Sequence, residues 1–144
     1  MFSLDPAWAG VSISRMQGQG ELRRIDRLSA AHALFARLGA ATEEFAGIAY
    51  LARDRRVLGL RLIRGGRDWV SVSARMLTVD ALAFHADGVV VAHNHPSGDP
   101  EPSAHDLAHA RRLARALRAV DVRLLDHLVI AGDRVTSLRA RGVL

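Results

Sequence analysis

Two residue types are missing from this chain of 144 residues: it has no cysteine, and all 20 of its Lys and Arg residues are arginine. Without cysteine the protein can form neither a disulfide nor a thiolate metal site. A metal ion would therefore have to be held by histidine and carboxylate side chains. The absence of cysteine is consistent with a reducing compartment, and we expect a cytoplasmic location.

A long apolar run is also missing. No stretch of about 18 apolar residues occurs, so no membrane span is predicted, and the N-terminus lacks the basic-then-apolar order of a secretory signal. The net charge of +5 raises the question of nucleic-acid binding. An all-arginine basic set more often reflects G+C-rich coding, so we favour a solvated basic surface and keep nucleic-acid binding as the alternative.

The hydrophobic pattern predicts alternating helices and strands within one domain. Residues 1–22 have no clear period and are interpreted as a flexible lead-in to a domain at residues 23–144. Helices are expected at residues 25–38, 74–86 and 103–120, and strands at 44–51, 57–63, 69–73, 88–92, 124–131 and 135–138. This order predicts an α+β fold that is three-layer α/β/α-like, with a mixed sheet between helices.

The strongest chemical signal follows the apolar strand GVVVA, where His93 and His95 come directly after its last residues. If the strand continues through His95, both imidazoles project from one face, because side chains alternate along a strand. Asp106 falls on the leucine side of the next helix, opposite Arg111 and Arg115. A carboxylate on a core-facing stripe needs a cation or strong donors. These three residues are therefore the candidate metal ligands.

The remaining residues around this motif allow more than one interpretation. Ser103 precedes Asp106 by three residues, which is a helix-capping pattern. Glu43 and Glu44 open the first strand, and alternation lets at most one of them face a cleft as general base. His105 and His109 fall at the boundary of the helix faces. His127 is interpreted as a buried strand histidine near the site, with Asp126 as its partner.

The spacing His93-x-His95, seven residues, Ser103, two residues, Asp106, with an upstream glutamate, resembles the JAMM (MPN+) metallopeptidase motif. The string AHNHPSGDPEPSAHD is similar to the RadC branch of that superfamily. EFAGIAYLARDRRVL resembles the first hairpin of the family, and VSVSAR resembles the segment before its next helix. LLDHLVI and TSLRARG resemble its C-terminal strands, so the resemblance spans roughly residues 25–144.

The resemblance implies a JAB/MPN fold with a curved, cytidine-deaminase-like mixed sheet. It also implies zinc (Zn²⁺) on His93, His95 and Asp106. Glu44 would be the general base, with Glu43 as the one-residue-slip alternative, and Ser103 would stabilise the oxyanion or orient the water. RadC-like proteins often carry an N-terminal helix-hairpin-helix region that binds DNA, and we do not expect one in this chain.

The leading hypothesis is therefore a zinc-dependent hydrolase of peptide or isopeptide bonds, acting on a peptide or protein substrate. One alternative is a RadC-type protein associated with DNA repair or mobile elements that acts by binding nucleic acid. Another is a non-catalytic MPN scaffold with a structural metal. An HNH nuclease is disfavoured because its residues spread over a ββα hairpin, whereas here they are contiguous before PSG. A homodimer is compatible with the sequence.

Overall fold

The computed structural model describes residues 12–15, 24–65 and 72–144. The helices are α1 (Leu28–Phe35), the 3-10 helix η2 (Ala36–Ala40), α2 (Ala74–Ala83) and α3 (Ala104–Arg118). The strands are β1 (Ser12–Arg15), β2 (Phe45–Leu51), β3 (Val57–Arg64), β4 (Gly88–Asn94), β5 (Arg123–Ala131) and β6 (Arg134–Ser137).

These strands form one six-stranded sheet in the order β1-β3-β2-β4-β5-β6. β4 and β5 are parallel and are joined through α3, whereas every other neighbouring pair is antiparallel. The sheet is therefore mixed, as the sequence predicts. β4 lies inside the sheet between β2 and β5, in agreement with its continuous run of β-branched residues.

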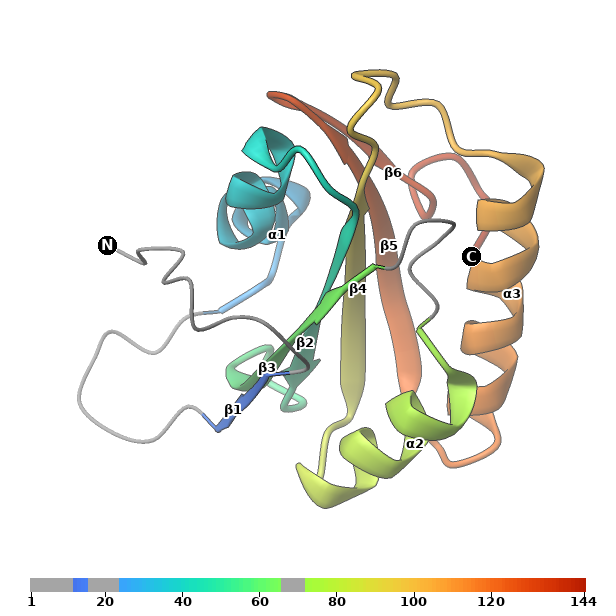
Figure 1. Ribbon diagram of the computed structural model, residues 1–144. Coiled ribbons are helices and arrows are strands. Elements are labelled where there is room, and N and C mark those ends of the chain that lie inside the picture. Colours follow the sequence, from blue (N-terminus) through green and yellow to red (C-terminus); the bar gives the residue numbers. More distant parts are fainter. Residues whose placement is uncertain (1–11, 16–23, 66–71) are drawn as a thin grey trace.

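Helices cover both faces of the sheet. Figure 1 shows α1 on one side, and α2 and α3 together on the other. Alternate residues of β4 supply the two cores: Val89 and Val91 pack in the cluster that contains residues of α2 and α3, and Val90 and Ala92 pack in the cluster that contains residues of α1. This arrangement confirms the predicted α+β fold with α/β/α-like layers.

Three predicted elements differ from the structure. The helix expected at residues 25–38 is α1 followed by η2, which runs on through Gly39 to Ala40. A Cβ at Gly39 would lie 1.8 Å from the carbonyl oxygen of Gly132, so this glycine allows the helix to approach the β5–β6 turn. Of the strand expected at residues 69–73, residues 69–71 lie outside the described residues. Val72 is not in a strand, and Ser73 is the N-cap of α2.

The third difference concerns the N-terminal lead-in. Within residues 1–22, Ser12–Arg15 form the edge strand β1, which pairs with β3. The prediction of a lead-in without regular structure is therefore wrong for these four residues. The rest of that range lies outside the described residues, and the domain boundary after residue 22 stays a prediction.

A buried polar network ties α2 to the sheet. Asp80 of α2 accepts two hydrogen bonds from the guanidinium of Arg61, at 2.5 and 2.7 Å, and one from the Tyr50 hydroxyl at 2.7 Å. Burial and the neighbouring Asp80 raise the pKa of Tyr50 above its ordinary value, so the phenol remains a donor. The network fixes α2 against β2 and β3.

Candidate metal centre

His93 and His95 come together where β4 ends. His93 lies in β4, and His95 follows it with its backbone N–H donating to the carbonyl of Ile130 in β5, at 2.8 Å. The extended path continues through His95, so both imidazoles project from one face. Their Nε2 atoms lie 3.1 Å apart. The predicted same-face arrangement is confirmed.

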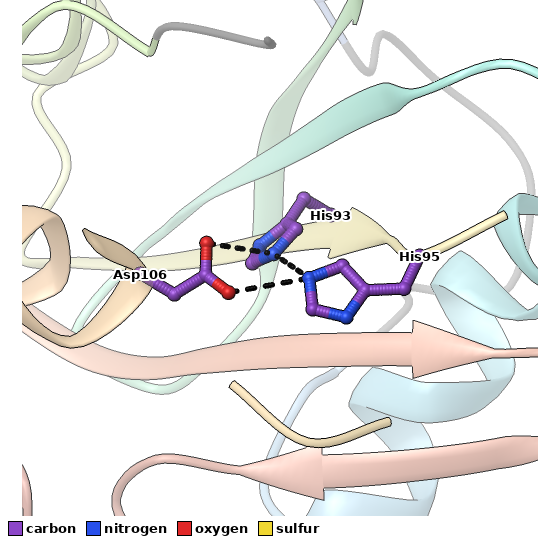
Figure 2. A group of neighbouring side chains, drawn as sticks. All are labelled: His93, His95 and Asp106. Atoms are coloured by element: carbon purple, nitrogen blue, oxygen red, sulfur yellow. Dashed lines mark hydrogen bonds and ion pairs between the residues drawn. The ribbon is translucent and has the colours of Figure 1, made fainter. Parts of the chain in front are cut away.

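Asp106 reaches the same point from α3. Its Oδ1 lies 3.3 Å from Nε2 of His93, and its Oδ2 lies 3.2 Å from Nε2 of His95. Figure 2 shows the three side chains pointing toward one another from the strand end and the helix. Asp106 is only 3% exposed, like the leucines on its side of α3, while Arg111 and Arg115 are exposed on the other side.

The start of α3 holds this carboxylate in place. The Ser103 hydroxyl accepts a hydrogen bond from the backbone N–H of Asp106 at 3.0 Å, and Oδ2 of Asp106 accepts one from the N–H of Ser103 at 2.8 Å. The capping pattern expected at Ser103 is thus a reciprocal capping box. Because the box fixes both ends of Asp106, it also orients its oxygens toward the histidines.

The spacing of the donor atoms on these three side chains fits a small tetrahedral ion. Zinc bonds of about 2.0–2.1 Å place two ligand atoms roughly 3.3–3.4 Å apart at the tetrahedral angle. Here the two Nε2 atoms lie 3.1 Å apart, and the nearer Asp106 oxygen lies 3.3 Å from that of His93 and 3.2 Å from that of His95. A cavity of about 30 Å³ adjoins them. A single water needs about 10–15 Å³ of such space. The His-His-Asp group could therefore hold a metal ion with room beside it for a water.

The two candidate bases, Glu44 and Glu43, lie in different surroundings. Glu44 lines the cavity together with the three candidate ligands. Its charge also contributes to the raised pKa of His95. The carboxylate of Glu43 instead forms an ion pair of 2.5 Å with Arg64 at the surface. Of these two glutamates, Glu44 alone lines the cavity.

The asparagine between the two histidines holds the segment that carries Glu44. Asn94 is buried, and it projects from the opposite face of β4. Its Oδ1 accepts from the N–H of Phe45 at 2.7 Å, and its Nδ2 donates to the carbonyl of Glu43 at 2.8 Å. These two bonds fix the backbone on both sides of Glu44. No sequence pattern predicted this contact.

Each histidine makes a second contact through Nδ1. In His95 this atom donates to the carbonyl of Asp99 at 2.9 Å. In His93 it lies 2.8 Å from Nε2 of His127, whose side chain is buried. The sequence interpretation of His127 as a buried strand residue near the site is confirmed. The expected partner of its imidazole is corrected: Asp126 accepts from the backbone N–H of His127 at 2.7 Å, and it also accepts from the Ser137 hydroxyl and the Arg139 N–H.

Electrostatics in the cluster follow from these contacts. Burial would raise the pKa of Asp106, but hydrogen bonds from His93, His95 and the Ser103 N–H together hold it far below its ordinary value. The hydrogen bond to Asp106 raises the pKa of His95. Burial lowers the pKa of His127 well below its ordinary value, so this ring is neutral. Asp106 is thus a permanent anion facing two imidazoles.

Two further placements were not resolved by sequence reasoning. His109 is buried and lines the cavity, whereas its neighbour on the helix, His105, is exposed. Ser103 is not among the residues that line the cavity in the part of the chain that the structure describes. The position of His109 one turn after Asp106 on the same side of α3 was the available signal, since residues three apart share a helix face.

Comparison with known proteins gives a consistent picture. Residues 25–143 match the sequence profile of the family described as "RadC-like JAB domain". A UPF0758 protein of Halorhodospira halophila is 50% identical over 104 residues, which cover 72% of this chain and 46% of that protein. A UPF0758 protein of Bordetella avium is 42% identical over 96 residues, which cover 66% of this chain and 43% of that protein.

The chain thus spans about half the length of the curated relatives it matches. The matched region contains strands β2 to β6, helices α1 to α3 and the whole His-His-Asp group, whereas the edge strand β1 precedes it. Among the described residues, none of the helices is long and apolar enough to cross a membrane.

Proposed function

This chain belongs to the RadC-like JAB domain family, and from that membership and its metal-ligand geometry we propose that it is a zinc-dependent metallohydrolase that cleaves peptide or isopeptide bonds. The observation that carries the proposal is the convergence of His93, His95 and Asp106 on one point beside a cavity that Glu44 lines. Three protein ligands and room for a water are the pattern of catalytic zinc sites, whereas structural sites use four protein ligands.

The residues of the site would divide the work as follows. A zinc ion on His93, His95 and Asp106 would supply a Lewis acid and lower the pKa of water to about 7. Glu44 accepts the proton of the attacking water and then returns it to the leaving amine. Ser103 donates its hydroxyl hydrogen to the oxygen of the scissile carbonyl as negative charge develops there.

The test compares two neighbouring glutamates in the zinc-loaded protein. Glu44→Gln removes the base without removing a ligand, so it should keep one zinc per chain and lose at least about 100-fold in kcat. Glu43→Gln is the matched control, because that carboxylate pairs with Arg64 at the surface. Turnover is followed on a library of fluorogenic peptides and lysine side-chain amides. Equal activity in Glu44→Gln and the wild type would refute the assigned role.

A second candidate function rests on a different surface. A cavity of about 450 Å³ beside α3 has five arginines among its lining residues, and no aspartate or glutamate among the described residues lines it. The five are Arg111, Arg115, Arg118, Arg123 and Arg139. Within the described residues, none of the five forms an ion pair with a carboxylate. Such uncompensated charge favours a phosphate backbone, so nucleic-acid binding is the alternative function.

Salt dependence tests this alternative. On duplex DNA, each phosphate contact makes the slope of log binding constant against log salt concentration more negative by roughly 0.9. If the cavity binds DNA, changing Arg111, Arg115 and Arg118 together to glutamine should flatten that slope by about 2 to 3. Arg112→Gln, on the same helix but outside the cavity, is the control. Weak binding that does not respond to salt in the wild type would rule this function out.

If the protein is instead a non-catalytic scaffold, it should bind metal and turn over none of the fluorogenic peptides or lysine side-chain amides. We further propose a peptide or protein substrate, a homodimer and a cytoplasmic location.

A further inference from the structure

His127 is a buried imidazole that touches a candidate ligand without being one of the three candidate ligands itself. Its Nε2 lies 2.8 Å from Nδ1 of His93, and the two ring planes are perpendicular with centroids 5.0 Å apart. His127 lies in β5, where it pairs in register with Val91 of β4. The contact therefore crosses the only parallel strand pair among the described strands.

The position of the protons in this pair follows from the chemistry of the ligand. A metal on Nε2 of His93 uses the lone pair of that nitrogen, so the proton of the neutral ring lies on Nδ1. Nδ1–H then donates to Nε2 of His127, which must accept. The same arrangement occurs at His95, whose Nδ1 donates to the carbonyl of Asp99. His127 thus does for His93 what a backbone carbonyl does for His95.

The other nitrogen of His127 shows that this arrangement has a cost. If Nε2 accepts, the proton of His127 lies on Nδ1. Nδ1 is buried and has no hydrogen-bond partner in the part of the chain that the structure describes. A buried donor without a partner destabilises the fold, and an apolar side chain of similar size would not carry that cost. Histidine at position 127 therefore lowers the stability of the fold but supplies an acceptor for the Nδ1–H of His93.

We propose that His127 is a positioning residue of the metal site: its Nε2 accepts the Nδ1–H of His93 and thereby presents Nε2 of His93 to the ion. Partners of this kind fix the tautomer and the ring orientation of a ligating histidine. The inference rests on the proposed metal-binding function and adds to it a residue outside the JAMM spacing.

Three variants separate positioning from packing. His127→Leu removes the acceptor and the unpartnered N–H together. His127→Gln places an amide oxygen near the position of Nε2 and restores an acceptor. Leu128→Ala, the next residue of β5, removes a fully buried side chain from the core on the α1 side of the sheet. The zinc dissociation constant of each metal-free protein is measured by competition with a chelator, and its thermal midpoint is measured without metal.

A positioning role and a packing role predict opposite effects on zinc affinity and on the metal-free thermal midpoint. We expect His127→Leu to weaken zinc binding about 10- to 100-fold, while its metal-free thermal midpoint stays equal to that of the wild type or rises. His127→Gln should recover most of the affinity. Leu128→Ala should lower the midpoint and keep the affinity. Affinity of His127→Leu within about threefold of the wild type would overturn the inference while leaving the metal site intact.

A spectroscopic measurement decides the matter even if His127→Leu does not fold. Nitrogen-15 shifts of the imidazoles in the zinc-loaded wild type should show His127 protonated on Nδ1 and His93 protonated on Nδ1. Protonation of His127 on Nε2 would contradict the proposal. A wild-type protein that binds no zinc would refute the proposed function itself, which is a different result from either outcome above.

Discussion

Asn94 accepts a hydrogen bond from the backbone N–H of Phe45, 49 residues earlier in the chain, over 2.7 Å. The same side chain donates to the carbonyl of Glu43, so its hydrogen bonds hold the backbone on both sides of Glu44. Because side chains alternate along β4, the tripeptide that sends His93 and His95 to one face sends Asn94 to the other. One short segment therefore supplies two candidate ligands and fixes the candidate base.

Removing the two hydrogen bonds of Asn94 should lower turnover more than it lowers zinc affinity. Asn94→Ala frees the segment that carries Glu44, and a displacement of about 1 Å in such a group can cost roughly 100-fold in rate. We expect kcat to fall at least tenfold with zinc affinity within a few-fold of the wild type. Val90→Ala, in the same strand and on the same face, is the control for lost packing. Parallel losses of kcat in both variants would mean that Asn94 only stabilises the fold.

Ser103 has a demonstrated structural contact and a proposed chemical one, and a substitution can separate them. Asparagine caps helices as well as serine does, whereas alanine costs about 1 kcal/mol. Ser103→Asn should therefore keep the free energy of unfolding, and Ser103→Ala should lower it. If the hydroxyl also stabilises the oxyanion, Ser103→Asn should lose about 100-fold in kcat. Full turnover in Ser103→Asn would leave Ser103 as a cap alone.

Much of the site could be predicted from local patterns. The run GVVVA identified a buried strand, so the alternation of side chains placed His93 and His95 on one face. The period of α3 placed Asp106 with Leu113 on the buried side. In both cases the period of a single element decides the direction of a side chain.

Contacts between distant elements could not be predicted in this way. The choice between Glu43 and Glu44 depends on how β2 pairs with β4, and alternation alone leaves both possibilities open. The contact between His127 and His93 depends on the parallel register of β5 against β4. The edge strand β1 is only four residues long and is held by pairing with β3, so its own sequence carries little signal.

The polar network of α2 gives a prediction about stability. Asp80→Asn removes the charge that neutralises Arg61, whose side chain is 13% exposed. Breaking one partner of such a pair should cost about 3 kcal/mol in the free energy of unfolding, at the low end for buried pairs because Arg61 reaches solvent. Asp54→Asn breaks a surface pair with Arg56 and should change stability little. Denaturant unfolding of the metal-free proteins checks both.

The raised pKa of His95 predicts opposite pH trends with and without metal. In the metal-free protein the hydrogen bond to Asp106 favours the protonated ring. Its stabilising effect is complete below about pH 6.5 and is lost as pH rises through the higher folded-state pKa. Zinc displaces that proton, so zinc affinity should fall by about tenfold per pH unit below that pKa.

Two quantities are measured between pH 5.5 and 8.5. The first is the difference in thermal midpoint between the metal-free wild type and metal-free His95→Gln, and we expect the wild type to gain relative to the variant at the acidic end. The second is the zinc affinity of the wild type, which should be higher at the alkaline end. Zinc affinity that does not change over this range would contradict the assignment of His95 as a ligand.

Zinc titration of the metal-free protein measures whether His93, His95 and Asp106 together hold one metal ion. We expect one zinc per chain in the wild type and in His85→Asn, an exposed histidine whose positive φ of 52° asparagine tolerates. His95→Ala should lose the site, with affinity reduced by at least about 100-fold. Equal zinc binding by His95→Ala and the wild type, or no binding by the wild type, would contradict the account.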